Sequence, residues 1–354
     1  MHRIARQPAL DPVMNYLYPG EDIEPKRREI DRITSADEFQ DKVMRFAVKR
    51  VIEKSCQGFT IEGFENLDRS KNYLYVSNHR DIMLDASLLT YELIMNGYRS
   101  PEITFGANLM QGQFVIDVGK SNKMFRVERP GSDMREFYKA SEHLSDYIRT
   151  TITQKKESIW IAQRNGRTKD GIDRTDQAIV KMFAMSGPKD RVKAIADLNI
   201  VPIAISYEWE PCDLLKAIEL YKRSQGPYQK QPGEDLHSII TGVIQQKGRV
   251  HMVLCKPITE EDLYPYEALP SNAFYRTVAS ILDSRICSAY KLFPNNFIAH
   301  DILHDAQTYC TRYTEQEREQ FEKHLADCET EEIRRILLGI YANPIDSKLL
   351  FTEA

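Results

Sequence analysis

The sequence has no long hydrophobic run. No stretch approaches 18 apolar residues without a charged one, which argues against a transmembrane helix. The first residues include basic side chains but lack the apolar segment of a secretory signal. We therefore expect a cytoplasmic protein, and a peripheral contact with the inner face of the membrane is the alternative.

Paired cysteines and a strong net charge are missing as well. The six cysteines are scattered without a C-x-x-C pair, and in a chain of 354 residues this favours reduced thiols over a disulfide framework. The formal net charge of −4 is too small to indicate a nucleic-acid partner. Internal repeats and low-complexity tracts are also absent, so the function has to be inferred from motifs.

The composition is that of a folded protein, with 42% hydrophobic and 28% charged residues. After position 57, β-prone runs alternate with helical patterns, which predicts an α/β domain with a largely parallel mixed sheet flanked by helices. We assign residues 57–260 to this domain. The expected strands are Gly58–Glu62, Tyr73–Ser77, Glu102–Gly106, Ser158–Gln163, Asn199–Tyr207 and Arg249–Cys255. The expected helices are Ile82–Asn96, Met134–Gln154 and Asp176–Met185.

The N-terminal segment, residues 1–56, begins with a proline-rich stretch that we expect to be a loosely held arm. A helix over Asp37–Ser55 follows, with Lys42, Arg45 and Lys49 on one stripe. Two interpretations of this helix stay open, because it could pack on the domain or rest on an anionic membrane surface.

The C-terminal segment, residues 261–354, shows only helical patterns. The pair Asn343-Pro344 predicts a turn near the end of the chain. The expected helices are Asn272–Tyr290, Phe297–Cys310, Glu315–Cys328 and Glu331–Tyr341.

The stretch YLYVSNHRDIMLD, residues 73–85, places His79 at the end of a predicted strand. Catalytic groups on open α/β sheets lie just beyond the carboxyl ends of strands. A neutral imidazole can accept the proton of an attacking alcohol, and a carboxylate behind the ring fixes its tautomer. Asp85 is our first choice for that carboxylate. Asp81 is the second, although it would also suit the N-cap of the next helix.

A basic turn follows the strand predicted near residue 160. It contains Gly166, Arg167 and Lys169, within a run that also includes Arg164 and Arg174. A glycine lets the backbone approach a ligand closely, and guanidinium groups match phosphate in a bidentate way. At the end of a strand, this run predicts an anion site.

Two further segments accompany these. Gly119–Arg129 includes Phe125 and ends in a charged cluster. Ile200–Ser206 contains Pro202, which has no N–H to donate and therefore predicts a strand start or an edge strand.

In their order along the chain, the four segments resemble the motifs of the PlsC-like glycerol-phosphate and phospholipid acyltransferase family, over roughly Ile61 to Pro257. The family motif is N-H-x-x-x-x-D, but Leu84 occupies the aspartate position here and Asp85 follows one residue later. The basic turn lacks the glutamate of the common third motif. It is closer to soluble plastid-type glycerol-3-phosphate acyltransferases, in which a Gly-Gly-Arg turn and a further basic residue bind the substrate phosphate.

The resemblance implies a role for each candidate residue. His79 would be the general base, oriented by Asp85 or Asp81. The acceptor-binding residues would be Phe125, Arg129, Gly166, Arg167 and Lys169, with Pro202 on a strand that lines the acyl or acceptor pocket.

The literal H-x-x-x-x-D spacing occurs elsewhere, at His300 and Asp305 in the segment HDILHD. His300 and His304 are also spaced for a metal site on one helix face. No strand leads into this segment, so we interpret it as a helix surface rather than as the acyltransferase motif.

The implied reaction is acyl transfer from acyl-CoA or acyl carrier protein to a hydroxyl of glycerol 3-phosphate or lysophosphatidic acid in phospholipid biosynthesis. A thioester is already activated, so no metal or redox cofactor is expected. Two other classes stay open: a hydrolase, either an acyl-thioesterase or a metal enzyme using His300 and His304, and a non-catalytic module that binds lipid or an acyl carrier.

Overall fold

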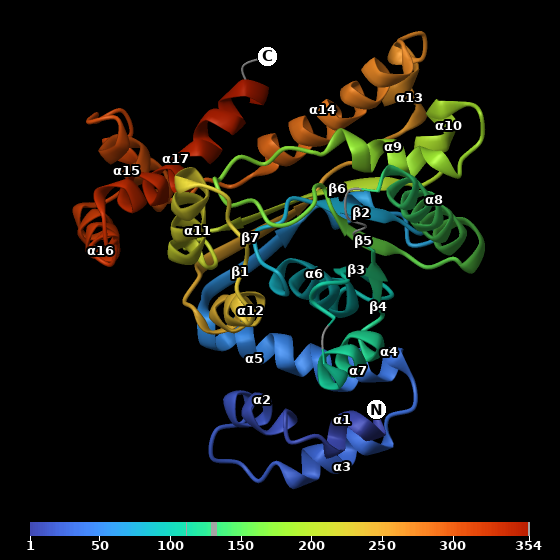
Figure 1. Ribbon diagram of the computed structural model, residues 1–354, viewed down its shortest axis with the longest axis horizontal. Coiled ribbons are helices and arrows are strands. Elements are labelled where there is room, and N and C mark those ends of the chain that lie inside the picture. The colour runs from blue at the N-terminus through green and yellow to red at the C-terminus, as the bar shows by residue number, and fades with distance from the viewer. Residues whose placement is uncertain (111, 129–132, 353–354) are drawn as a thin grey trace.

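The computed structural model describes residues 1–110, 112–128 and 133–352. Its centre is a seven-stranded sheet in the order β1-β7-β6-β2-β5-β3-β4 (Figure 1). Neighbouring strands are parallel except for the antiparallel pair β6 and β7. The strands are β1 (Cys56–Glu62), β2 (Leu74–Ser77), β3 (Glu102–Gly106), β4 (Met124–Val127), β5 (Ile159–Ala162), β6 (Ile200–Tyr207) and β7 (Gly248–Leu254). The predicted fold class is confirmed.

Helices cover both faces of the sheet (Figure 1). On one face lie α5 (Arg45–Ser55) and α6 (Leu84–Met95). The other face carries α8 (Met134–Thr150), α9 (Gln177–Met185), α10 (Arg191–Ala196), α13 (Glu260–Leu263) and α14 (Ser271–Ala289). The remaining α/β-domain helices are α7 (Gln113–Ser121), α11 (Asp213–Gln225) and α12 (Glu234–Ile244).

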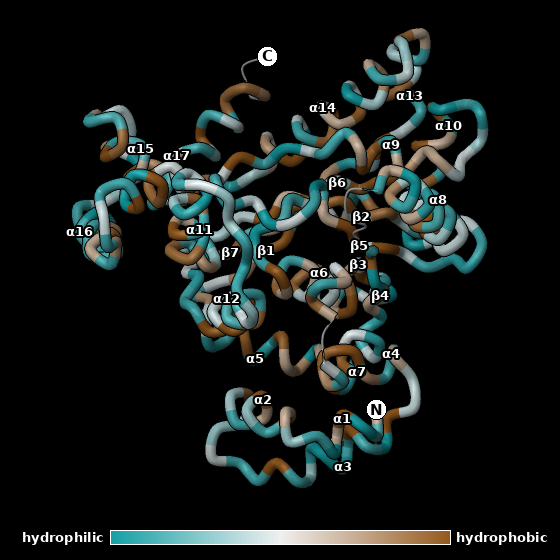
Figure 2. Tube along the Cα trace, in the orientation of Figure 1, coloured by the Kyte–Doolittle hydropathy of each residue, from teal (hydrophilic) through white to brown (hydrophobic). Residues whose placement is uncertain are grey.

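Apolar side chains of the inner strands point alternately to both faces of the sheet, which explains why helices have to cover both faces. In β2, Leu74 and Val76 join the core under α8 and α14, whereas Tyr75 joins the core under α5 and α6. All eight residues of β6 are buried. The hydropathy tube in Figure 2 is accordingly brown along much of the sheet and largely teal along the surface helix α3 (Glu24–Arg32). A strand that is apolar on both faces is typical of a sheet sandwiched between helix layers.

The N-terminal segment is packed, so the prediction of a loosely held arm is wrong. It forms α1 (His2–Arg6), α2 (Leu10–Leu17), α3 and α4 (Ala36–Phe39), which share a small core with residues such as Ile4 and Met14. Arg3 donates to both carboxylate oxygens of Asp117 on α7, at 2.6 and 2.9 Å. Pro25 lies in the first turn of α3, where a missing N–H does no harm, so this proline is compatible with a packed helix.

The C-terminal segment is helical as predicted, with one correction. Its longer helices are α14, which packs on the sheet, and α15 (Pro294–Leu303), α16 (Glu315–Leu325) and α17 (Glu331–Thr352). The turn predicted at Asn343-Pro344 is wrong, because α17 runs through it with Pro344 inside the helix. Burial of Tyr341, Pro344 and Ile345 offsets the hydrogen bond that a proline removes. The division at residues 56 and 260 stays a prediction.

Sequence patterns missed β4 and several helices, notably α7, α11 and α12. β4 has only four residues and α7 only nine, so each offers a short pattern. Within the described ranges, no helix is both long and apolar enough to cross a membrane.

Candidate active site

His79 lies in the loop between β2 and α6. Its Nδ1 is 2.9 Å from Oδ2 of Asp85 in the first turn of α6. The same oxygen accepts the backbone N–H groups of Arg80 at 2.6 Å and Asp81 at 2.9 Å. The loop is therefore wrapped around the Asp85 carboxylate, which is how an aspartate six residues after the histidine reaches the ring.

Asp85 is almost fully buried, at 1% exposure, and is held from a second side. The hydroxyl of Tyr207, at the end of β6, donates to Oδ1 of Asp85 at 2.8 Å. Burial and the nearby Asp85 raise the pKa of Tyr207 well above its usual range, so it stays a donor. With four hydrogen bonds to Asp85, the carboxylate is fixed relative to the imidazole.

Asp81 has a different role. Its Oδ1 accepts the backbone N–H groups of Met83 and Leu84, both at 2.8 Å, and so caps α6. Its Oδ2 is buried and has no partner in the part of the chain that the structure describes. Burial, and then the neighbouring Asp85, raise the pKa of Asp81. The structure thus pairs His79 with Asp85 and leaves Asp81 to the helix start.

Arg80, the residue after the histidine, is fully buried. Its guanidinium contacts Oδ2 of Asp173 at 2.7 Å and Oε2 of Glu210 at 3.4 Å. Lys216 closes the network, because its ammonium lies 2.7 Å from the Arg80 carbonyl and 2.5 Å from Oε1 of Glu210. Two cations and two carboxylates therefore fix the loop that carries His79, and sequence patterns gave no sign of this network.

The basic turn lies directly beside His79. It follows β5, and the backbone N–H of Thr168 donates to the His79 carbonyl at 2.7 Å. Gly166 has a φ of +78°, a left-handed conformation that favours glycine. Arg167 is only 8% exposed, and its Nη1 has no hydrogen-bond partner among the described residues. An unpartnered buried guanidinium nitrogen is available to an anion.

Lys169, predicted as a second phosphate ligand, already has a carboxylate partner. Its ammonium forms an ion pair with Glu219 on α11, and Arg223 contacts the same oxygen at 2.7 Å. Burial lowers the pKa of Lys169, although Glu219 opposes this effect. Glu219 therefore competes with any bound anion for Lys169.

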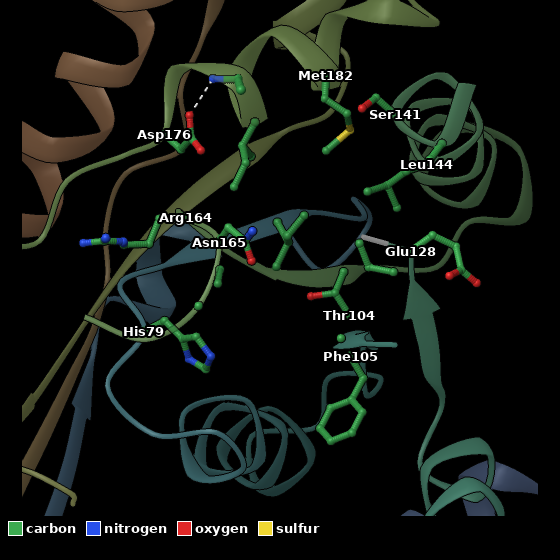
Figure 3. A pocket seen from close by; sticks show the side chains of 18 of the residues that line it. His79, Thr104, Phe105, Glu128, Ser141, Leu144, Arg164, Asn165, Asp176 and Met182 are labelled. Carbon is green, nitrogen blue, oxygen red and sulfur yellow. Dashed lines mark hydrogen bonds between the residues drawn. The ribbon is translucent and has the colours of Figure 1, made fainter. Parts of the chain in front are cut away.

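Two cavities share His79 in their linings. One, of about 260 Å³, is mostly apolar and includes Phe105, Val127, Leu144, Trp160 and Met182 in its lining. The other, of about 340 Å³, is lined by the cations Arg164, Arg167, Lys169, Arg223 and Lys230. Both also contact Ile82, Leu109 and Gly166. Figure 3 shows the His79 ring directed into the apolar cavity below Asn165.

Trp160 of β5 supports the histidine from the apolar side. Its ring meets the imidazole edge-on, with centroids 5.6 Å apart, and its Nε1 donates to the Ser77 hydroxyl at 3.0 Å. Trp160, Tyr207 and Arg80 are site residues that the sequence did not reveal. Tyr207 ends a predicted strand and Arg80 closely follows another, which was the available signal for these two residues, whereas Trp160 lies within a predicted strand.

Of the other three predicted site residues, two lie away from the two cavities and one lies outside the described residues. Phe125 is on β4 and packs on Tyr147 of α8, with ring centroids 4.7 Å apart. Pro202 is buried as the third residue of β6, an inner strand between β7 and β2. It therefore lies near a strand start, as one of the two predictions had it, and the alternative of an edge strand is wrong. Neither residue lines a cavity at His79. Arg129 lies outside the described residues.

The segment HDILHD forms the end of α15 and the turn after it. The His300 ring packs at an angle against His304 and Tyr309, with ring centroids 4.5 and 4.9 Å away, and its Nδ1 is 3.4 Å from Oδ1 of Asp301. Within the described ranges, no group of three or more His, Cys, Asp or Glu side chains is arranged to hold a metal ion.

Comparison with known proteins agrees with the motifs. Residues 58–206, from β1 to β6, match the family model described as Acyltransferase. The chain therefore carries an acyltransferase-family domain, and the predicted family is confirmed for this region. No curated protein matches the chain. A solved structure that is similar to it is the 1-acyl-sn-glycerophosphate (LPA) acyltransferase PlsC from Thermotoga maritima, with 15% identity, a TM-score of 0.36, and coverage of 77% of this chain and 85% of that one.

Proposed function

We propose that the chain transfers the acyl group of an acyl thioester, acyl-CoA or acyl carrier protein, to a hydroxyl of a glycerol-phosphate-type acceptor. The observation that carries this proposal is the position of His79. Its Nδ1 is bonded to Asp85, and the ring lies where an apolar cavity meets a basic one. A reaction that joins an acyl chain to a phosphate-bearing alcohol needs these two environments on either side of one base.

The acyl chain would occupy the apolar cavity and the acceptor phosphate the basic one. Arg167 is the main phosphate ligand, because it is buried and its Nη1 is unpartnered among the described residues. Arg164 and Gly166 line both cavities and would lie close to the reacting groups. Lys169 binds more weakly, because Glu219 has to be displaced or shared.

Chemistry then needs only the imidazole and its carboxylate. Nε2 of His79 accepts the proton of the acceptor hydroxyl as its oxygen attacks the thioester carbonyl carbon. Asp85 stabilises the imidazolium that forms. When the tetrahedral intermediate collapses, the C–S bond breaks and the imidazolium returns the proton to the departing sulfur. Base and carboxylate are regenerated, so no metal or redox cofactor is required.

The acceptor is glycerol 3-phosphate or lysophosphatidic acid, and the second would require contact with a bilayer. The basic stripe predicted for this contact consists of Lys42 just before α5, Arg45 at its start and Lys49 within it. Lys42 pairs with Glu38 at 2.7 Å, and Arg45 pairs with Asp41 at 3.1 Å. Lys49 pairs with Glu53 at 3.8 Å. This charge balance weakens attraction to anionic lipid and favours the water-soluble acceptor.

The test measures transfer of a labelled acyl group from acyl-CoA and from acyl carrier protein, with each acceptor in turn. We expect an acylated acceptor from at least one combination. Release of free fatty acid alone would indicate a thioesterase, and donor binding without turnover would indicate a binding module.

The phosphate site is tested with Arg167→Gln. Loss of a charged hydrogen bond should raise the KM for the acceptor about 10- to 100-fold, with little change in the KM for the donor. Arg126→Gln is the matched control, because Arg126 is an exposed cation on β4 that lines neither cavity. Equal acceptor KM values in the two variants would contradict the assigned phosphate site.

A further inference from the structure

The C-terminal helix α17 reaches the loop that carries the basic turn. Nδ2 of Asn343 donates to the backbone carbonyl of Asp170 at 2.7 Å. Next to it, Gly171 approaches the Ile340 carbonyl so closely that a Cβ at position 171 would overlap that oxygen. Gly171 also has a φ of +79°. Two consecutive residues of the loop are therefore fitted against one turn of α17.

Pro344 explains why this turn of α17 can make such contacts. A proline has no N–H, so the carbonyl four residues earlier, that of Ile340, loses its helical donor. This is the carbonyl that lies against Gly171. The Asn-Pro pair therefore does not end the helix; it opens one carbonyl and places the Asn343 amide beside the loop.

A second contact from the same turn supports the buried network under His79. The hydroxyl of Tyr341 donates to Oδ2 of Asp213 at 2.6 Å and accepts the backbone N–H of Glu210 at 3.0 Å. The Glu210 carboxylate contacts the Arg80 guanidinium, and that guanidinium also donates to the Gly171 carbonyl at 3.3 Å. The loop at Gly171 is thus held by α17 on one side and by Arg80 on the other.

We propose that α17 positions the acceptor site, with Asn343 and Tyr341 as positioning residues. Asp170 and Gly171 follow closely after Arg167 and Lys169, so fixing them fixes the direction of both cations. The class of ligand rests on the proposed function, but the positioning of the loop at Asp170 and Gly171 by α17 does not. Both positioning residues lie outside the matched region 58–206, so the α/β domain would depend on the C-terminal helix for its acceptor site.

The experiment compares Asn343→Ala and Asn343→Asp with Asn66→Ala and Asn66→Asp. Asn66 makes the same kind of bond elsewhere, from Nδ2 to the Leu254 carbonyl at 2.8 Å. We expect the Asn343 variants to raise the KM for glycerol 3-phosphate roughly threefold to tenfold, with kcat and the donor KM within about twofold of wild type. Asn343→Asp should be the more severe, because it keeps the size of the side chain but sets a carboxylate against a carbonyl.

Hydrogen–deuterium exchange of residues 164–175 gives a readout that needs no activity. Exchange should accelerate in both Asn343 variants and in Tyr341→Phe, but not in the Asn66 variants. Wild-type exchange and wild-type acceptor KM in Asn343→Asp would overturn the proposal. So would equal changes in the Asn66 variants, which would indicate a general loss of stability. An inactive wild-type chain would overturn the proposed function instead, while the exchange data would still decide the coupling.

Discussion

His79 and His300 each precede nearby aspartates, yet their surroundings differ in almost every respect. His79 follows a buried strand, has its Nδ1 on a carboxylate that accepts four hydrogen bonds, and lies between two cavities. His300 lies on a helix, and its ring packs at an angle against the rings of His304 and Tyr309. His300, which matches the motif spacing to the letter, thus lacks the carboxylate geometry and the cavities that surround His79.

The carboxylates show the same contrast. Asp85 is directed at the imidazole by backbone N–H groups and by Tyr207. Asp301 instead accepts the Tyr309 N–H at 3.0 Å and the Tyr313 hydroxyl at 3.0 Å, so its oxygens hold the turn after α15. A histidine and a carboxylate become a catalytic pair only where the fold leaves the second ring nitrogen open to a substrate.

The largest effect should come from His79→Gln, compared with His300→Gln. Removing the base should lower kcat by about 10³-fold or more, since general base catalysis contributes about 10²–10⁴-fold. His300→Gln should keep kcat within about twofold of wild type. Steady-state kinetics of acyl transfer measures both. Comparable losses in the two variants would end the assignment of His79 as the base.

A smaller loss of activity should separate the two aspartates. Asp85→Asn removes the charge that stabilises the imidazolium. It also sets the new side-chain NH2 against groups that donate hydrogen bonds to Asp85. We therefore expect kcat to fall about 10²-fold or more. Asp81→Asn keeps a capping oxygen, and the buried Oδ2 that it replaces has no partner in the described residues. We expect near wild-type kcat for Asp81→Asn. A greater loss from Asp81→Asn than from Asp85→Asn would reverse the assignment.

The smallest effect concerns stability and comes from a third pair. His324 of α16 lies 2.7 Å from Asp213 of α11, and neither residue lines the two cavities at His79. Burial lowers the pKa of His324, but the hydrogen bond to Asp213 and its charge outweigh burial and raise it. Protonated His324 therefore stabilises the fold below the unfolded pKa of about 6.5, and this contribution is lost as pH rises through the folded pKa.

Urea unfolding at pH 6 and pH 9 checks this sign. The stability lost in His324→Gln should be greater at pH 6 than at pH 9, by about 1 kcal/mol. His237→Gln, at an exposed position on α12, is the control and should show no such difference. A loss that is equal at both pH values would mean that the histidine acts by packing alone.

The sequence by itself determined the α/β class and the order of the motif segments. Alternation of β-prone and helical runs is a local property, so six of the seven strands could be located from it. His79 and the basic turn could be found for the same reason, because strand ends mark where side chains converge. Residues such as Asp85 were identified as candidates because they lie near the histidine in sequence.

Only the tertiary structure decided which groups meet. Arg80 lies far in sequence from Tyr207, Glu210 and Lys216, and nothing local shows that the four residues share one buried network. Asn343-Pro344 has the local signature of a turn, but packing of α17 keeps it helical and sets it against Gly171. The choice between Asp81 and Asp85 was also tertiary in part, because Tyr207 holds the Asp85 carboxylate from a strand more than a hundred residues away. Contacts between distant segments depend on how buried surfaces fit together, and a periodicity does not carry that information.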